Sequence, residues 1–215
     1  AEPGFPGMRT PGRFPTGHMT TWVPGQTPLA VIDGLQWPLE KDADIVLEVH
    51  LQRTGKSETI RPQVGLYFTN APPSKSSFLV GLTSQLIDIP AGDTNYIVER
   101  QMTVPVESQA LTILPHAHYL AREIDAFALL PNGTKQPLLR IPNWDFNWQG
   151  EYRYREAVAL PAGSTLTMRI RYDNSAANIR NPNHPPRRVV FGPQSSDEMA
   201  ELWLQVLVKN AADLA

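Results

Sequence analysis

The chain has 215 residues, and its 19 basic and 21 acidic side chains leave a net charge of -2, which gives no indication of a nucleic-acid partner. It contains no cysteine, which excludes disulfides, thiolate metal sites and thiol nucleophiles, and no apolar run is long enough for a membrane-spanning helix. The 21 prolines, about twice average usage, separate short β-rich runs and favour an all-β fold.

The first third of the chain begins with residues 1–30, which are rich in Pro, Gly and Thr and are predicted to form an irregular arm. Strands are then predicted at residues 44–53, where apolar and polar side chains alternate, and at residues 62–69. A polar, proline-containing stretch follows. It is interpreted as a boundary between two domains, residues 1–75 and 76–215.

The rest of the chain is predicted to form short strands separated by turns. The predicted strands are residues 85–89, 96–104, 110–130, 136–141, 157–160, 165–172 and 189–191. This spacing indicates an antiparallel β-sandwich with jelly-roll or Greek-key connections. Residues 195–209 fit either a strand or a helix that begins with a capping box, and their propensities lean slightly toward the helix.

The clearest candidate for chemistry is the pair His116 and His118, two positions apart in a predicted strand. Alternation along a strand points both imidazoles to the same face, where they could chelate a borderline-soft metal. Taken alone, the motif fits a hydrogen-bonded histidine pair without metal equally well. His184 lies in a proline-containing loop and is expected to face solvent.

Further motifs follow the histidine pair in a fixed order. PHAHYL at residues 115–120 is followed by WDFNWQ at 144–149, YDNSA at 172–176, NPN at 181–183 and SDEM at 196–199. This set resembles the C-terminal domain of the copper type II, ascorbate-dependent monooxygenases, the family of peptidylglycine α-hydroxylating and dopamine β-monooxygenases. The resemblance covers about residues 79–208.

The resemblance implies a jelly-roll-like β-sandwich and a set of copper ligands. In that family two histidines and the methionine of a DEM-like element hold the oxygen-binding copper, and the matching residues are His116, His118 and Met199. It also implies that residues 199–208 form a strand beside the histidine strand. The ligand chemistry agrees, because a neutral thioether favours Cu(I) and is a poor ligand for zinc.

Residues 43–68 resemble the closing strands of the family's N-terminal domain, where a histidine helps to hold a second, electron-supplying copper. His50 occupies that position, but the chain lacks the adjacent His-His pair that completes the family's site. His18 is a weaker substitute. We therefore expect one tightly bound copper, and full activity only with residues upstream of Ala1 or an electron-donating protein.

The resemblance also places Leu114, Glu201 and Trp203 in the substrate pocket. Peptide-amidating members carry arginine, asparagine and tyrosine at these positions. Glu201 would repel a peptide carboxylate, so an amine or a neutral apolar substrate is expected instead.

The sequence therefore predicts an extracytoplasmic, periplasmic or secreted, copper monooxygenase that hydroxylates a C–H bond with dioxygen and an external reductant. A non-catalytic copper-binding module or carrier is the first alternative. A carbohydrate-binding jelly roll is the second, and only the aromatic residues Trp144, Trp148 and Tyr152 favour it.

Overall fold

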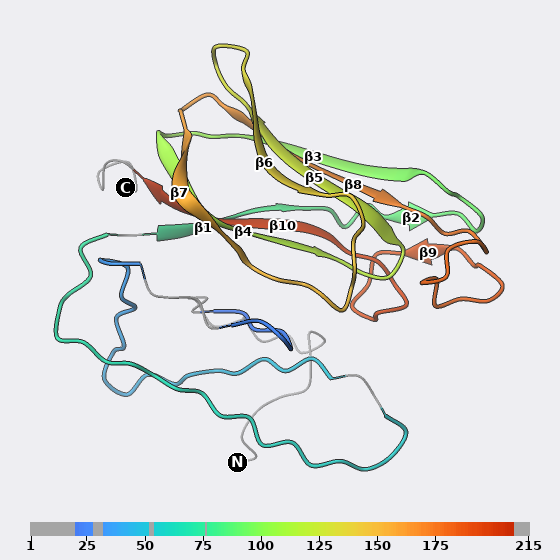
Figure 1. Cartoon of the computed structure of the whole chain (residues 1–215), viewed down its shortest axis with the longest axis horizontal. Helices are drawn as coiled ribbons and strands as arrows, with labels where there is room; N and C mark the ends of the chain where they lie inside the picture. The colour runs from blue at the N-terminus through green and yellow to red at the C-terminus, as the bar shows by residue number, and fades with distance from the viewer. Residues whose placement is uncertain (1–19, 28–31, 52–53, 76, 209–215) are drawn as a thin grey trace. The chain divides into compact units, whose positions relative to one another are not determined.

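The computed structural model describes residues 20–27, 32–51, 54–75 and 77–208 (Figure 1). The chain divides into two compact units. The first comprises Ala1–Met19 and Ala30–Lys75, and the second comprises Thr20–Leu29 and Ser76–Ala215. All the strands found in the described residues belong to the second unit, and these residues contain no helix that could cross a membrane.

The second unit is built from two four-stranded antiparallel sheets and one short strand pair. The first sheet has the order β1 (Ser77–Thr83), β10 (Ala200–Val208), β4 (Ser108–Ala117), β7 (Tyr152–Leu160). The second has the order β3 (Tyr96–Thr103), β8 (Thr165–Tyr172), β5 (Ala121–Leu129), β6 (Lys135–Ile141). β2 (Asp88–Ile89) pairs with β9 (Val189–Val190).

The two large sheets form the two layers of a sandwich (Figure 1). The chain passes from β1 to β3 in the other layer, returns to β4, and crosses again to β5, which is the connectivity of a jelly roll. This confirms the predicted all-β, antiparallel sandwich. β4 and β10 are central strands of the first sheet, so each has a partner on both sides.

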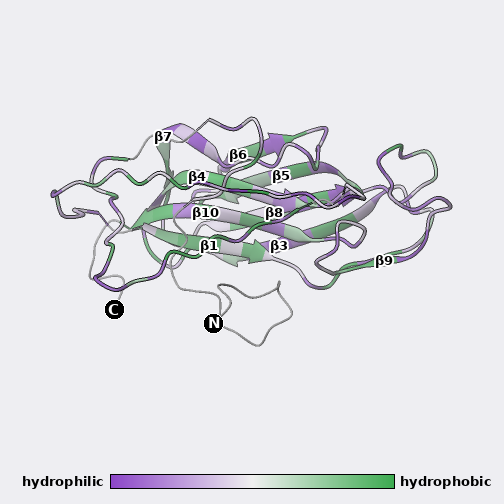
Figure 2. Cartoon of the chain, turned by 90° about the horizontal axis from the view of Figure 1, so that it is seen from below, coloured by the Kyte–Doolittle hydropathy of each residue, from purple (hydrophilic) through white to green (hydrophobic). Residues whose placement is uncertain are grey.

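The core lies between the sheets and follows the period-two alternation of the strands. Ile113 and Leu204 of the first sheet and Ile124 and Ile170 of the second are completely buried. Burial of each such side chain stabilises the fold by about 1.5–3 kcal/mol. Figure 2 shows hydrophobic and hydrophilic residues along the strands of both sheets, as expected when one face of each strand points into a core.

Several strands differ from the sequence prediction. The predicted strand at 110–130 is two strands, because the chain turns at Tyr119 and Leu120. The C-terminal segment is β10 beside β4, as the family resemblance implied for residues 199–208, and not the helix that its propensities favoured. Its pairing with β1 and β4 outweighs local preference. β1 has no counterpart among the predicted strands.

The first unit contains no strand among its described residues, so the predicted partial sheet is not found there. The alternating apolar side chains of the predicted strands are exposed, with exposed fractions of 65% for Leu51 and 79% for Phe68. A two-stranded hairpin is only marginally stable unless another element covers its apolar face. The interpretation of this unit as the remnant of a copper domain stays a prediction.

The outer face of the second sheet carries charged residues in register across three strands. Arg169 of β8 lies opposite Asp125 of β5, which lies opposite Arg140 of β6. In the next row Arg171 faces Glu123, with 2.5 Å between Nη2 and Oε1. Pairs this exposed contribute little stability each, but they keep this side of the sandwich hydrated.

Candidate metal centre

Strand pairing brings the two halves of the candidate site together. β10 runs antiparallel to β4, with Glu201 opposite His116 and Ala200 opposite Ala117. Met199, the residue before β10, therefore lies beside the end of β4 that carries the histidines. His116 Nε2 lies 3.3 Å from Met199 Sδ. His118 follows the last residue of β4, and its ring centroid is 5.2 Å from that of His116 at an interplanar angle of 86°. The structure thus gathers all three predicted ligands.

An oxygen atom lies within hydrogen-bond distance of Nδ1 of each imidazole. His116 Nδ1 donates to Gln149 Oε1 at 2.5 Å, and His118 Nδ1 donates to the carbonyl oxygen of Asp197 at 3.1 Å. A neutral imidazole has one N–H, so a ring with its proton on Nδ1 has a lone pair on Nε2 that can bind a metal. Hydrogen bonds of this kind commonly orient metal-binding histidines.

His118 is held in the neutral form that a metal ligand needs. It is 4% exposed, and burial together with the neighbouring His116 lowers its pKa from 6.5 to about 4. Its ring packs edge-on against Phe146, with 5.6 Å between the ring centroids. A metal therefore has no proton to displace from His118 at neutral pH.

The donor set fits copper better than a hard cation. Two neutral imidazoles and a neutral thioether are borderline-soft to soft donors, a set that suits Cu(I). Within the described ranges no group of three His, Cys, Asp or Glu side chains could hold a metal ion. Met199, which is 5% exposed, is the predicted third donor beside the two histidines. Its sulfur lies 3.3 Å from His116 Nε2, so one soft cation could bind both atoms.

The three residues predicted for the substrate pocket lie on the same sheet face as His116. Glu201 is opposite His116, and Trp203 is opposite Leu114. The Trp203 indole donates from Nε1 to Glu201 Oε2 at 3.0 Å, and all three side chains are partly buried. On the other side of β10, Gly81 of β1 is opposite Trp203 and leaves space for the indole ring. The structure thus places an acidic group and an aromatic ring next to His116.

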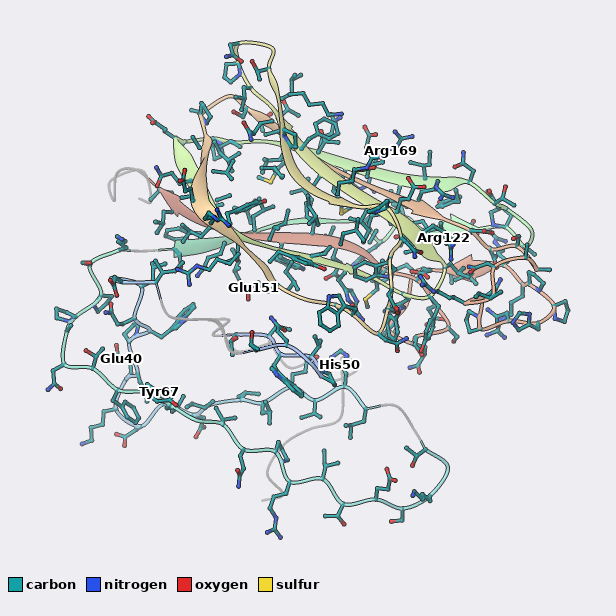
Figure 3. All side chains as sticks on the ribbon, viewed as in Figure 1. Glu40, His50, Tyr67, Arg122, Glu151 and Arg169 are labelled. Carbon is teal, nitrogen blue, oxygen red and sulfur yellow. The ribbon has the colours of Figure 1, made fainter. Side chains whose placement is uncertain are left out.

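The other histidines form no such cluster among the described residues. His50 belongs to the first unit (Figure 3), and its Nε2 lies 2.9 Å from Glu48 Oε1, with both side chains exposed. His18 lies outside the described residues. His184 is exposed, as predicted. The assignment of His50 as a ligand of a second copper stays a prediction.

Several buried residues around the site have contacts that the sequence did not indicate. Trp144 is 1% exposed and donates from Nε1 to the carbonyl oxygen of His118 at 3.1 Å, so it is not part of an exposed sugar-binding platform. Glu198 is completely buried, and burial raises its pKa to about 8 although backbone N–H donors act in the opposite direction. Gln149 and Glu198 lie within the WDFNWQ and SDEM motifs. The motifs therefore marked these positions without revealing what they contact.

No protein-family model matches the chain, and no curated protein matches it. The resemblance to the copper monooxygenases therefore rests on the motifs and stays an expectation.

Proposed function

We propose that the chain binds one copper ion as Cu(I) through His116, His118 and Met199 and uses it to hydroxylate a C–H bond with dioxygen. The observation that carries this proposal is the 3.3 Å approach of His116 Nε2 to Met199 Sδ beside a buried, neutral His118. A thioether at this position distinguishes a copper site from the nitrogen, oxygen and thiolate sites typical of zinc.

Three protein donors leave room for a small molecule to bind at the metal. Bound copper would supply one-electron chemistry with dioxygen. Hydroxylation consumes two electrons from outside the substrate, so an external reductant or an electron-donating protein completes the reaction. Extracytoplasmic localisation belongs to the same proposal and rests on the resemblance alone.

The chain's own residues favour an amine or a neutral apolar substrate. Trp203 offers an aromatic surface, and Leu114, opposite it, offers an apolar one. The Glu201 carboxylate accepts a hydrogen bond from Trp203 and would attract a cationic group. A substrate carboxylate at this position would meet like charge.

A non-catalytic copper-binding module or carrier is the second candidate. The observation that favours it is the exposed position of His50, whose Nε2 lies against the carboxylate of Glu48. A chain that holds one copper and has no route for a second electron would store or transfer the metal. Oxygen-dependent turnover in the presence of a reductant distinguishes the enzyme from the carrier.

The test is anaerobic Cu(I) titration combined with X-ray absorption. The wild-type chain should bind one copper with nitrogen and sulfur scatterers, and Met199→Leu should lose the sulfur contribution. Met168→Leu is the matched control, because Met168 is also buried but lies in β8, within the core. A wild-type spectrum without sulfur, or loss of sulfur in the control, would contradict the assignment.

A further inference from the structure

Glu198 is a buried acidic side chain with an unusual set of partners. Its Oε2 accepts hydrogen bonds from the backbone N–H of His118 at 2.8 Å and of Met199 at 3.3 Å, and its Oε1 accepts from the backbone N–H of Leu120 at 2.6 Å. It is 0% exposed. A buried carboxyl group is costly unless its oxygens are satisfied, and here they bind the backbone of two of the three proposed ligands.

The residues on either side of Glu198 also serve the site. The carbonyl oxygen of Asp197 accepts the Nδ1–H of His118, and Met199 supplies the sulfur. The backbone of Glu198 is itself fixed, because its N–H donates to Val190 O at 3.1 Å and its carbonyl accepts from Gly192 N at 3.2 Å. Three consecutive residues therefore orient one ligand ring, hold the backbone of that ligand and provide the next ligand.

Buried side chains also hold the carbonyl oxygens of the same two ligands. Trp144 donates to His118 O at 3.1 Å, and the Tyr172 hydroxyl donates to Met199 O at 2.6 Å. Both aromatic side chains are at most 1% exposed. The backbone N–H and C=O of His118 and of Met199 are thus all bound to buried side chains. Tightly satisfied networks of this kind hold functional groups in one geometry.

We propose that Glu198 is a positioning residue, which sets the spacing between the His118 imidazole and the Met199 thioether through its bonds to their backbones. This role rests on the proposed function, since it concerns the ligands of the proposed copper. Glu198 itself does not need to touch the metal. Loss of a group that orients metal ligands typically weakens metal affinity about 10–100-fold.

The experiment compares Glu198→Gln with a control at an equally buried polar residue. The glutamine keeps the size of the side chain but turns an NH₂ group toward N–H donors, which breaks the bonds on one side. Asn174→Leu is the control: Asn174 is also 0% exposed and donates to the carbonyls of Ile89, Pro90 and Arg187, none of which belongs to the site. We expect Cu(I) affinity to fall about 10–100-fold in Glu198→Gln and to stay near the wild-type value in Asn174→Leu.

A second readout needs no metal. In the copper-free wild-type chain, ¹⁵N NMR should show His118 with its proton fixed on Nδ1, and Glu198→Gln should show exchange between the two tautomers. Should the glutamine variant fail to fold, Glu198→Asp keeps the carboxyl group but is one methylene shorter, and it should give a smaller loss of affinity.

Wild-type affinity and an unchanged tautomer in Glu198→Gln, or in Glu198→Asp if only that variant folds, would overturn the proposal. Equal losses of affinity in Glu198→Gln and Asn174→Leu would overturn it as well, because the effect would then follow stability alone. If the wild-type chain bound no Cu(I), the proposed function would fail. The NMR comparison would still decide whether Glu198 orients His118.

Discussion

The contact between Gly81 and Trp203 predicts the effect of a single added methyl group. Gly81 lies opposite Trp203 in the pairing of β1 with β10, and the benzene part of the indole covers it. A Cβ atom at position 81 would lie 2.5 Å from Cζ3 and 2.8 Å from Cε3 of the ring, so Gly81→Ala must displace the ring. Overpacking of this kind costs about 1–3 kcal/mol, and alanine recovers about 0.5–1 kcal/mol in a strand interior.

The net loss in the free energy of unfolding should therefore be about 1–2 kcal/mol, or roughly 2–8 °C in Tm for a unit of this size. Urea titration of the copper-free chain measures it. Gly150→Ala is the matched control, because a Cβ atom at position 150 would meet no other atom within 4 Å. That variant should be as stable as the wild type or slightly more stable.

A double-mutant cycle tests the cause of the loss. With Trp203→Leu the ring is absent, so adding Gly81→Ala should cost nothing further. If Gly81→Ala destabilises the Trp203→Leu chain as much as the wild type, the ring is not what the methyl group meets, and the reasoning fails.

Two further predictions concern the histidines. His116→Ala should abolish tight Cu(I) binding in a competition titration, whereas His184→Ala, at an exposed loop position, should leave it intact; equal losses would move the site to the loop. Because burial lowers the pKa of His118 to about 4, the unfolded chain binds more protons between pH 4 and 6.5, and stability is lost as the pH falls through that window. The full loss is about 3 kcal/mol below pH 4. Urea titrations should show that the stability advantage of the copper-free wild type over His118→Gln shrinks from pH 7 to pH 4. The comparison isolates His118, because Glu198 titrates in both proteins and its contribution cancels. A difference that does not change with pH would contradict this.

The sequence predicted the bounds of a strand correctly where the alternation of apolar and polar residues agrees with the pairing of that strand in the sheet. β8 has the predicted bounds, because its alternation is regular and a Pro-Ala-Gly turn precedes it. The turn at Tyr119–Leu120 was not predictable, since no Gly, Pro or Asn marks it. It is stabilised instead by Glu198, which binds the Leu120 N–H from 78 residues away. β10 shows the same limit, because strand pairing across the sheet overrode its helical propensity.

The sequence predicted the ligands of the candidate site but not the residues that hydrogen-bond to those ligands. His116 and His118 could be placed together from alternation, and Met199 could be added from the ordered motifs. Gln149 and Asp197 orient the two rings from 33 and 79 residues away, and nothing in the local sequence indicates those contacts. Contacts between residues this far apart in the chain leave no periodic pattern in the sequence.

The charged rows on the outer face of the second sheet have a consequence for how that sheet assembles. A slip of two residues between β5 and β8 would keep every apolar side chain pointing inward, so the core alone discriminates poorly against it. In one direction the slip would set Glu123 opposite Asp173, and in the other it would leave Arg171 without an acidic partner. The correct alignment pairs Glu123 with Arg171 and Asp125 with Arg169. The hydrated side of the sheet therefore adds a preference for the correct strand alignment to the weak discrimination that the apolar interior provides.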